Sequence, residues 1–211
     1  GVPRPSSLPR RYLLIGGALF VGCEISLALA IGLAHGRGQA LELVMLTYLW
    51  PCLTVLLAVL TRQQRATWLL APATVLCLAG VMLVVTGDRA WSPAMLMGNV
   101  RDNPVAYALA LCAACMWASY SVVTRRIGGS RNGVPLFMLF TAGALWLKYL
   151  LGGDPALPLH WGGLGQVAMF GLLTAAAYCC WNHGLQHGNI TSMAIFSYFA
   201  PVLSVLFSCM W

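Results

Sequence analysis

Residues 47–60 read TYLWPCLTVLLAVL, a run that contains no charged side chain and has Pro51 near its centre. Together with the preceding residues, the run 41–60 reaches the roughly 20 mainly apolar residues that an α-helix needs to cross a bilayer. A proline inside a helix removes one backbone hydrogen bond and pushes on the carbonyl four residues earlier, here that of Thr47. The stretch therefore predicts a membrane-spanning helix that is kinked at Pro51.

The same pattern returns 150 residues later. Residues 48–56 read YLWPCLTVL and residues 198–206 read YFAPVLSVL. The preceding loops also match, as GLAHG and GLQHG. Five predicted spans separate each unit from its copy, and an odd number places the two copies in opposite orientations. This predicts an inverted-topology repeat, an architecture that recurs in secondary transporters; a chance match between short apolar segments is the alternative.

The composition extends this prediction to the whole chain of 211 residues. Hydrophobic residues make up 60% and charged residues only 8%, whereas soluble domains carry about 25% charged residues. These values exclude a soluble globule, a disordered chain and a nucleic-acid-binding protein. The continuous apolar runs lack the strict alternation of a membrane β-barrel. We therefore expect an all-α polytopic membrane protein.

Seven segments are long and apolar enough to be predicted as spans. They are 12–34, 41–60, 68–86, 104–124, 134–151, 163–185 and 190–211. We expect residues 1–90 to form three helices that end a first repeat, residues 91–103 to be the loop between the repeats, and residues 104–211 to form four helices of the second. If each repeat has five helices, the full protein has ten, and the chain is truncated at both ends.

The basic residues give the predicted orientation. The net charge is +7. Eight of the 12 Lys and Arg residues fall on one side of the predicted membrane, in the segments 4–11, 62–65 and 125–131. Loops that are rich in Lys and Arg face the cytoplasm, so these three segments are predicted to be cytoplasmic.

The two proline-containing spans each have one face of small and hydroxylated residues. In one span this face contains Thr47 and Pro51, flanked by Tyr48 and Trp50. In the other it contains Ser197 and Pro201, flanked by Tyr198. The functional interpretation is that both faces line a central solute cavity. The alternative is close helix packing by small residues, which is common in membranes.

Two further spans place aromatic residues among small ones. The span 104–124 carries Trp117 and Tyr120, and the span 163–185 carries Tyr178, Trp181 and Asn182. Large aromatic side chains beside small ones suit a pocket for a flat apolar solute. Aromatic residues at the membrane interface are the alternative. That alternative fits Tyr12, which lies at the end of its span, better than it fits Trp117 or Tyr178.

Glu24 is a carboxylic acid inside a predicted span. Such a residue is a functional candidate by default, either as a proton-coupling site or as a partner for a substrate ammonium group. A hydrogen-bonded structural role is the alternative. The cysteines and histidines form no metal-binding pattern, and the sequence contains no phosphate-binding loop. We predict no catalytic residue, metal or cofactor.

Several segments resemble the drug/metabolite transporter superfamily, in its EamA-type branch. These are TYLWPCLTVLLAVL, SYFAPVLSVLFSCMW, LALCAACMWASYSVVTRR and AAAYCCWNHGLQHGNITSMAIFSYFAP. The form TYLWP is similar to that of the YddG-type aromatic amino acid exporters of bacterial inner membranes. The resemblance implies ten helices in two inverted five-helix repeats around a central cavity.

The expected function is export of aromatic amino acids, or of similar neutral amphipathic metabolites, by alternating access. The expected partners are a small-molecule substrate and the lipid bilayer, without nucleic acid, and the protein is expected to be a monomer in the bacterial inner membrane. Export of another solute, such as a drug-like cation, a purine or a sugar derivative, is the alternative within the superfamily. An intramembrane enzyme and a channel are further alternatives that fit the residues less well.

Overall fold

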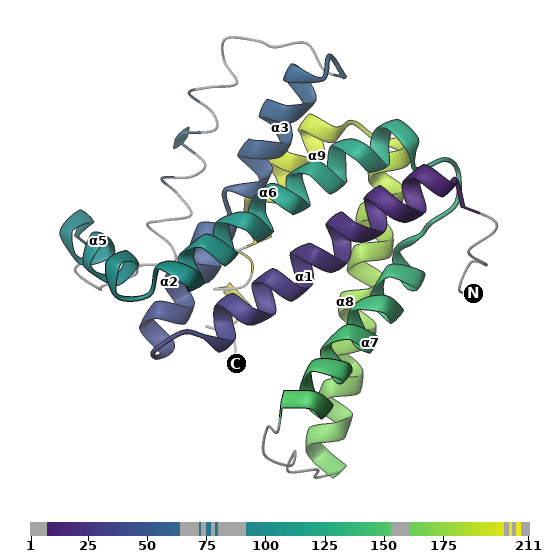
Figure 1. The fold of residues 1–211 in the computed structure, drawn as a ribbon. Helices are drawn as coiled ribbons and strands as arrows, with labels where there is room; N and C mark the ends of the chain where they lie inside the picture. The colour runs from purple at the N-terminus through teal and green to yellow at the C-terminus, as the bar shows by residue number, and fades with distance from the viewer. Residues whose placement is uncertain are drawn as a thin grey trace.

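The computed structural model describes residues 8–63, 92–152 and 161–200, with a few isolated positions at 72–79 and 203–207. Helices account for the regular structure of these residues, and no strand occurs among them. Figure 1 shows their arrangement. The elements are η2 (a π-helical turn, Tyr12–Gly16), α1 (Gly17–Gly32), α2 (Arg37–Thr47), α3 (Trp50–Leu60), α5 (Pro93–Asp102), α6 (Pro104–Ile127), α7 (Val134–Gly152), α8 (Trp161–His187) and α9 (Ile190–Phe196).

Five continuous segments are long and apolar enough to cross a membrane, which confirms an all-α polytopic membrane protein. They are Tyr12–Gly32, Arg37–Leu60, Pro104–Ile127, Val134–Gly152 and Trp161–His187. They correspond to five of the seven predicted spans. Almost all of the predicted span 68–86 lies outside the described residues, and the span 190–211 is described mainly over α9.

The segment 91–103, which we expected to be a loop, contains helix α5. Its sequence explains the helix, because the Ser92 side chain accepts a hydrogen bond from the Met95 backbone N–H at 3.1 Å and a proline follows it. A serine cap followed by proline is a strong start signal for a helix. The next helix begins in the same way, since the Asn103 side chain accepts from the Ala106 N–H at 3.3 Å and precedes Pro104.

Helices α1 and α6 pack closely against each other in opposite directions (Figure 1). Three contacts between side chains or backbone fix this pairing along its length. At the start of the first span the Tyr12 hydroxyl lies 3.2 Å from that of Tyr120, and near the middle the Cys23 thiol donates to the Ala113 carbonyl at 3.3 Å. At the end of α1 the Asn103 amide donates to the Leu33 carbonyl at 2.7 Å.

Small residues of both helices lie at this contact, because Ala106 and Ala110 of α6 pack with Ala30 of α1 in one buried cluster. Four alanines spaced four residues apart are buried, with relative exposures of 0–1%. They are Ala106, Ala110, Ala114 and Ala118. Residues with this spacing share one face of a helix. Small residues at such positions let membrane helices approach and gain van der Waals contact, which replaces the hydrophobic driving force that lipid does not supply.

The kink predicted at Pro51 occurs as a two-residue turn that separates α2 from α3 within the span Arg37–Leu60. Helix α2 ends at Thr47, and a turn at residues 48 and 49 precedes Trp50. In the turn the Tyr48 backbone N–H donates to the Met45 carbonyl at 3.0 Å. The Thr47 hydroxyl donates to the carbonyl of residue 44 at 2.6 Å. The break therefore costs few hydrogen bonds, because a tighter turn and a side-chain hydroxyl satisfy carbonyls that the helix no longer uses.

The same local structure occurs in the second copy of the motif. Helix α9 ends at Phe196, and a turn follows at residues 197 and 198. The Ser197 hydroxyl donates to the Ala194 carbonyl at 2.6 Å. The Tyr198 N–H donates to the Ile195 carbonyl at 3.1 Å. Ser197 and Tyr198 lie 150 residues after Thr47 and Tyr48 and form the equivalent hydrogen bonds.

Helices α3 and α9 pack against each other and run in opposite directions. Both are tied to the C-terminal end of α6. The side chain of Gln63, just after α3, donates to the Val122 carbonyl at 3.2 Å. The Arg125 guanidinium donates to the Leu185 carbonyl at 3.2 Å, just before α9 begins. The end of α3 and the start of α9 therefore lie at the same end of α6.

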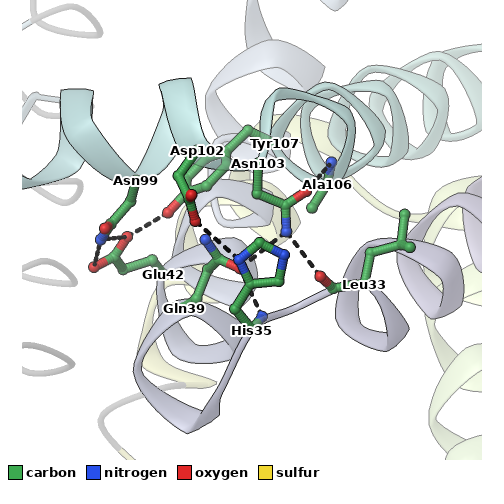
Figure 2. Close-up of polar contacts among 9 residues, drawn as sticks. All are labelled: Leu33, His35, Gln39, Glu42, Asn99, Asp102, Asn103, Ala106 and Tyr107. Atoms are coloured by element: carbon green, nitrogen blue, oxygen red, sulfur yellow. Dashed lines mark hydrogen bonds and ion pairs between the residues drawn. The ribbon is translucent and has the colours of Figure 1, made fainter.

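The opposite end of α6 is held by a network of polar side chains, which Figure 2 shows. His35 in the α1–α2 turn lies 2.8 Å from the carboxylate of Asp102 at the end of α5. In α2, Glu42 accepts two hydrogen bonds from the Asn99 amide at 2.9 and 3.0 Å, and one from the Tyr107 hydroxyl. The network joins α2, α5 and α6, so α5 is an integral part of this end of the bundle.

A glycine before α7 provides a test of the packing around η2. A Cβ at Gly133 would lie 2.9 Å from a ring carbon of Tyr12 and 3.0 Å from one of Phe137, and both rings are fully buried. Gly133→Ala is expected to lower the free energy of unfolding by about 1–3 kcal/mol, which is the usual cost of overpacking. Chemical unfolding in detergent measures the change. Gly143→Ala in α7 is the control, because nothing lies within 4 Å of its Cβ position; equal stability of the two variants would contradict the packing described here.

Candidate functional site

A cavity of about 180 Å³ lies where α1, α2, α3, α6 and α8 meet. Its lining consists of aromatic, small and hydroxylated residues with one carboxylic acid. The lining residues are Cys23, Glu24, Leu27, Thr47, Trp50, Ala113, Ala114, Trp117 and Tyr178. Helices from widely separated parts of the sequence thus contribute to one site within the apolar spans.

Trp117 on α6 is the centre of the aromatic wall. Its ring centroid lies 5.2 Å from that of Tyr178 at an interplanar angle of 39°, and 6.1 Å from that of Trp50 at 83°. Phe20 packs against Trp117 and Tyr178, and its ring centroid lies 5.8 Å from that of Trp117 and 5.5 Å from that of Tyr178. Each such aromatic pair contributes about 0.5–1.5 kcal/mol beyond simple burial. The wall is therefore held by its own contacts before any solute enters.

Glu24 is the acidic residue of the lining. The Tyr178 hydroxyl donates to its Oε1 at 2.8 Å, which joins α1 to α8 across the cavity. No Lys, Arg or His is among the residues that line the described cavity. Glu24 also lies well inside the span Tyr12–Gly32, far from both membrane surfaces. Its carboxyl group consequently has a hydroxyl partner and no cationic one within the described part of the chain.

The volume of the cavity suits a single ring. An apolar cavity of about 150 Å³ inside a protein binds benzene, and this cavity measures about 180 Å³. Its wall of Trp and Tyr faces also matches the way aromatic rings prefer to pack, edge to face or offset. The site can hold an aromatic ring with a small polar extension towards Glu24.

Five of the residues that the sequence singled out line this cavity. They are Glu24, Thr47, Trp50, Trp117 and Tyr178. Pro51 is buried at the start of α3, where it ends the hydrogen-bonding pattern of α2, and Tyr48 lies partly buried in the turn before it. Neither belongs to the lining.

Four lining residues were missed from the sequence, namely Cys23, Leu27, Ala113 and Ala114. Helical spacing contained the signal for three of them. Cys23 and Leu27 flank Glu24 at one and three residues, and the two alanines precede Trp117 by four and three residues. Residues three and four apart face the same way on a helix, so Leu27, Ala113 and Ala114 were predictable from Glu24 and Trp117, whereas Cys23 shares its spacing of four only with Leu27.

Tyr120 and Asn182 lie next to the cavity in a buried hydrogen-bonded cluster. The Asn182 Oδ1 accepts from the Tyr120 hydroxyl at 2.6 Å and from the Tyr12 hydroxyl at 3.0 Å. All three side chains have a relative exposure of 0%. The prediction that Tyr12 faces the membrane interface is therefore wrong. In the sequence, a tyrosine at the end of a span looks the same whether its hydroxyl contacts lipid headgroups or a buried amide.

The cluster continues to the segment before α7. The Asn182 Nδ2 donates to Oδ1 of Asn132 at 3.0 Å, and the Asn132 amide donates to the Cys179 carbonyl at 3.0 Å. Trp181 precedes Asn182 on α8, and its ring centroid lies 5.1 Å from that of Trp50. Its indole N–H is buried and has no hydrogen-bond partner among the described residues. Trp181 thus supports the cavity wall from outside the lining.

The residues predicted in the last span are only partly described. Ser197 is partly buried and Tyr198 is buried in the turn after α9, and neither lines the described cavity. Pro201 lies outside the described residues.

Comparison with known proteins agrees with this architecture. The sequence profile of the EamA-like transporter family matches residues 104–211. A curated relative from Salmonella typhimurium is 42% identical over 204 residues, which cover 97% of this chain and 70% of the relative. The chain belongs to the EamA-like transporter family. It is therefore a multi-pass membrane transporter and not an enzyme.

The relatives share a name. The protein from Salmonella typhimurium and one from Escherichia coli, which is 41% identical with the same coverage of both chains, are each called aromatic amino acid exporter YddG. A third relative with this name, from Ancylobacter novellus, is 29% identical over 98% of this chain and 79% of its own length. A protein of known crystal structure superposes with a TM-score of 0.76 at 25% identity, covering 96% of this chain and 67% of the other. The chain thus belongs with the YddG-type exporters of the family.

Replacing the central acceptor of the buried cluster tests its role in stability. Asn182→Leu leaves the Tyr120 and Tyr12 hydroxyls without their shared acceptor, and a buried polar group that loses its partner costs ~1–3 kcal/mol. The free energy of unfolding in detergent is expected to fall by this amount. Gln166→Leu is the matched control, because Gln166 lies on the same helix and is exposed. A loss no greater than that of the control would contradict a stabilising cluster.

Proposed function

We propose that the protein exports aromatic amino acids across the bacterial inner membrane, with the cavity around Trp117 as the substrate site. The observation that carries this proposal is the single-ring volume of the cavity together with its wall of Trp50, Trp117 and Tyr178. The names of the three relatives point to the same substrate class. Other small amphipathic solutes are the alternative.

The cavity divides the substrate into two parts. The aromatic side chain packs against the rings of Trp117 and Trp50. The polar end of the amino acid is directed towards the hydroxyl and carboxyl groups of Thr47, Tyr178 and Glu24. A pocket with mainly apolar walls and a few placed polar groups is the usual form of a small-molecule site. Selectivity for aromatic over aliphatic amino acids follows from the ring contacts.

Transport proceeds by alternating access between two inverted repeats. The first repeat ends with residues 1–90, the connection lies at 91–103 and includes α5, and the second repeat begins at 104. Three observations support this division: the motif repeated 150 residues apart, the equal hydrogen bonds at the two breaks, and the opposite directions of α3 and α9. Rocking of one repeat against the other opens a site between them to one side of the membrane at a time.

The arginine-rich segments 4–11, 62–65 and 125–131 face the cytoplasm in this proposal. The contacts of Gln63 and Arg125 at the C-terminal end of α6 support one common end for the last two segments. The network of Glu42, His35 and Asp102 then lies at the opposite, periplasmic end. The lipid bilayer is the surrounding partner, and the transporter acts as a monomer.

Substitution of Trp117 tests the substrate site. Trp117→Ala in the full-length protein removes the ring that contacts both Trp50 and Tyr178. Several contacts of ~0.5–1.5 kcal/mol each are lost, and about 1.4 kcal/mol corresponds to a factor of ten. The initial rate of counterflow of labelled phenylalanine and tryptophan in proteoliposomes is expected to fall at least tenfold.

Two further variants separate binding from folding. Trp117→Phe keeps an aromatic ring and is expected to retain more counterflow than the alanine variant. Trp146→Ala on α7 removes a tryptophan that is 56% exposed, outside the cavity, and is expected to transport like the unmodified protein. Absence of saturable aromatic amino acid counterflow by the unmodified protein would refute the proposed substrate class. Equal rates for Trp117→Ala and Trp146→Ala would refute the proposed site.

A further inference from the structure

The polar side chains of the cavity lining share one chemical property. Each hydroxyl or thiol that reaches the cavity already donates its hydrogen to another group. The Thr47 hydroxyl donates to the Val44 carbonyl at 2.6 Å, and the Cys23 thiol donates to the Ala113 carbonyl at 3.3 Å. The Tyr178 hydroxyl donates to Glu24 at 2.8 Å. Only the oxygen and sulfur lone pairs of these groups remain available to a solute, so the groups act as hydrogen-bond acceptors.

We propose that this acceptor cluster is an ammonium-binding subsite, in which Glu24 pairs with the α-amino group of the substrate. The inference rests on the proposed function and deepens it. It makes a protonated amine the polar group that the site requires. The substrate class of the cavity is then a primary amine that carries an aromatic ring, and the carboxylate of an amino acid is secondary for recognition.

The number and kind of acceptors match an ammonium group. A protonated primary amine has three N–H donors, no acceptor and one positive charge. Glu24 Oε2 has no hydrogen-bond partner among the described residues, while Oε1 has one lone pair occupied by Tyr178. The Thr47 and Tyr178 oxygens supply further acceptors at the same cavity. A substrate carboxylate, which accepts only, finds no donor among Glu24, Thr47, Tyr178 and Cys23, and the indole N–H groups of Trp50 and Trp117 are the donors that the lining side chains could offer it.

The charge balance of the site leads to the same conclusion. A buried ionised carboxylate without a cation carries a large desolvation cost, and such residues in membrane spans pair with a positive group or mark a solute path. The lining contains no Lys, Arg or His among its described residues. Arg125, on the helix that carries Trp117, is instead bonded to the Leu185 and Gly188 carbonyls at the end of the bundle. Among the described lining residues no cation can pair with Glu24, so a positive charge at this site can be supplied by a solute.

Tyr178 has a positioning role in this subsite. Its ring is held between Phe20 and Trp117, with centroids at 5.5 and 5.2 Å. Its hydroxyl fixes Oε1 of Glu24, which leaves Oε2 for the ammonium group. The same ring forms part of the aromatic wall. One side chain thus sets the separation between the ring and the amine of a bound molecule, which favours solutes in which a short chain joins the two.

Competition binding tests the inference with the full-length protein in detergent at one fixed neutral pH. Labelled tryptophan is displaced by phenethylamine, which keeps the ring and the amine, or by 3-phenylpropionate, which keeps the ring and the carboxylate. The expected result is that phenethylamine displaces tryptophan at a concentration at least tenfold lower than 3-phenylpropionate. Equal or better displacement by 3-phenylpropionate would overturn the ammonium subsite.

Variants assign the preference to Glu24. Glu24→Gln retains the size and the acceptor for Tyr178 but removes the charge, and it is expected to lose the tenfold preference for phenethylamine. Asp102→Asn is the matched control, since this carboxylate is exposed and lies outside the cavity; it is expected to keep the preference. An unchanged preference in Glu24→Gln would overturn the assignment. If Glu24→Gln does not fold, Tyr178→Phe replaces it. This variant loses the hydroxyl that positions Glu24 and is expected to show a smaller preference for phenethylamine over 3-phenylpropionate. The comparison of the two ligands on the unmodified protein tests the subsite without any variant.

The outcomes distinguish this inference from the proposed function. If the unmodified protein neither binds nor transports aromatic amino acids, the proposed function fails and the subsite fails with it. If it binds and transports tryptophan but shows no preference for the amine, the proposed function stands and the ammonium subsite alone is refuted. If Glu24 serves only in proton coupling, the ammonium subsite is likewise refuted while the proposed function stands. In that case Glu24→Gln and the unmodified protein would show the same relative displacement by phenethylamine and 3-phenylpropionate, because the measurement is made at one pH and without a gradient.

Discussion

The close antiparallel contact between α1 and α6 is the interaction on which the rest of the structure depends. Ala106 and Ala110 of α6 pack with Ala30 of α1, and nearer the middle of the pair the Cys23 thiol donates to the Ala113 carbonyl. This contact places Glu24 on one helix beside Trp117 on the other, at the same cavity.

Lipid offers no hydrogen bonds, so every polar group in these spans must find a partner inside the protein or face a cavity. Near the two ends of α6, the cluster around Asn182 and the network around Glu42 join hydroxyl and amide donors to side-chain acceptors. The cavity between them differs, because its hydroxyl and carboxyl groups have acceptors left over. These remaining acceptors are the feature on which the proposed ammonium subsite depends.

The sequence predicts the fold and five of the nine residues that line the described cavity. The physical reason for success or failure differs from residue to residue. Long apolar runs and the repeated proline motif report directly on spans and on the break at Pro51. Glu24 and Trp117 were found because a charge or a large ring in an apolar run is conspicuous. Ala113 carries no such signal, and only its position relative to Trp117 reveals its role.

Tyr12 was assigned to the interface because its burial depends on Asn182, 170 residues away. Helix α5 was missed because it is too short and polar to resemble a span, although Ser92 and the proline after it mark its start.

The equal breaks in the two copies of the motif connect the local structure with the proposed transport cycle. At each break the hydroxyl of Thr47 or Ser197 satisfies a carbonyl within its own helix, so the turn keeps its hydrogen bonds without help from neighbouring helices. The segment on one side of such a turn can reorient relative to the other side at little cost in hydrogen bonding. Helices α3 and α9 pack together in opposite directions, so the two turns have inverted orientations in the bundle, as the proposed cycle requires. In the proposed cycle these two turns are the places where each repeat could bend, and a small solute would shift the balance between an inward-open and an outward-open arrangement by binding one of them more tightly.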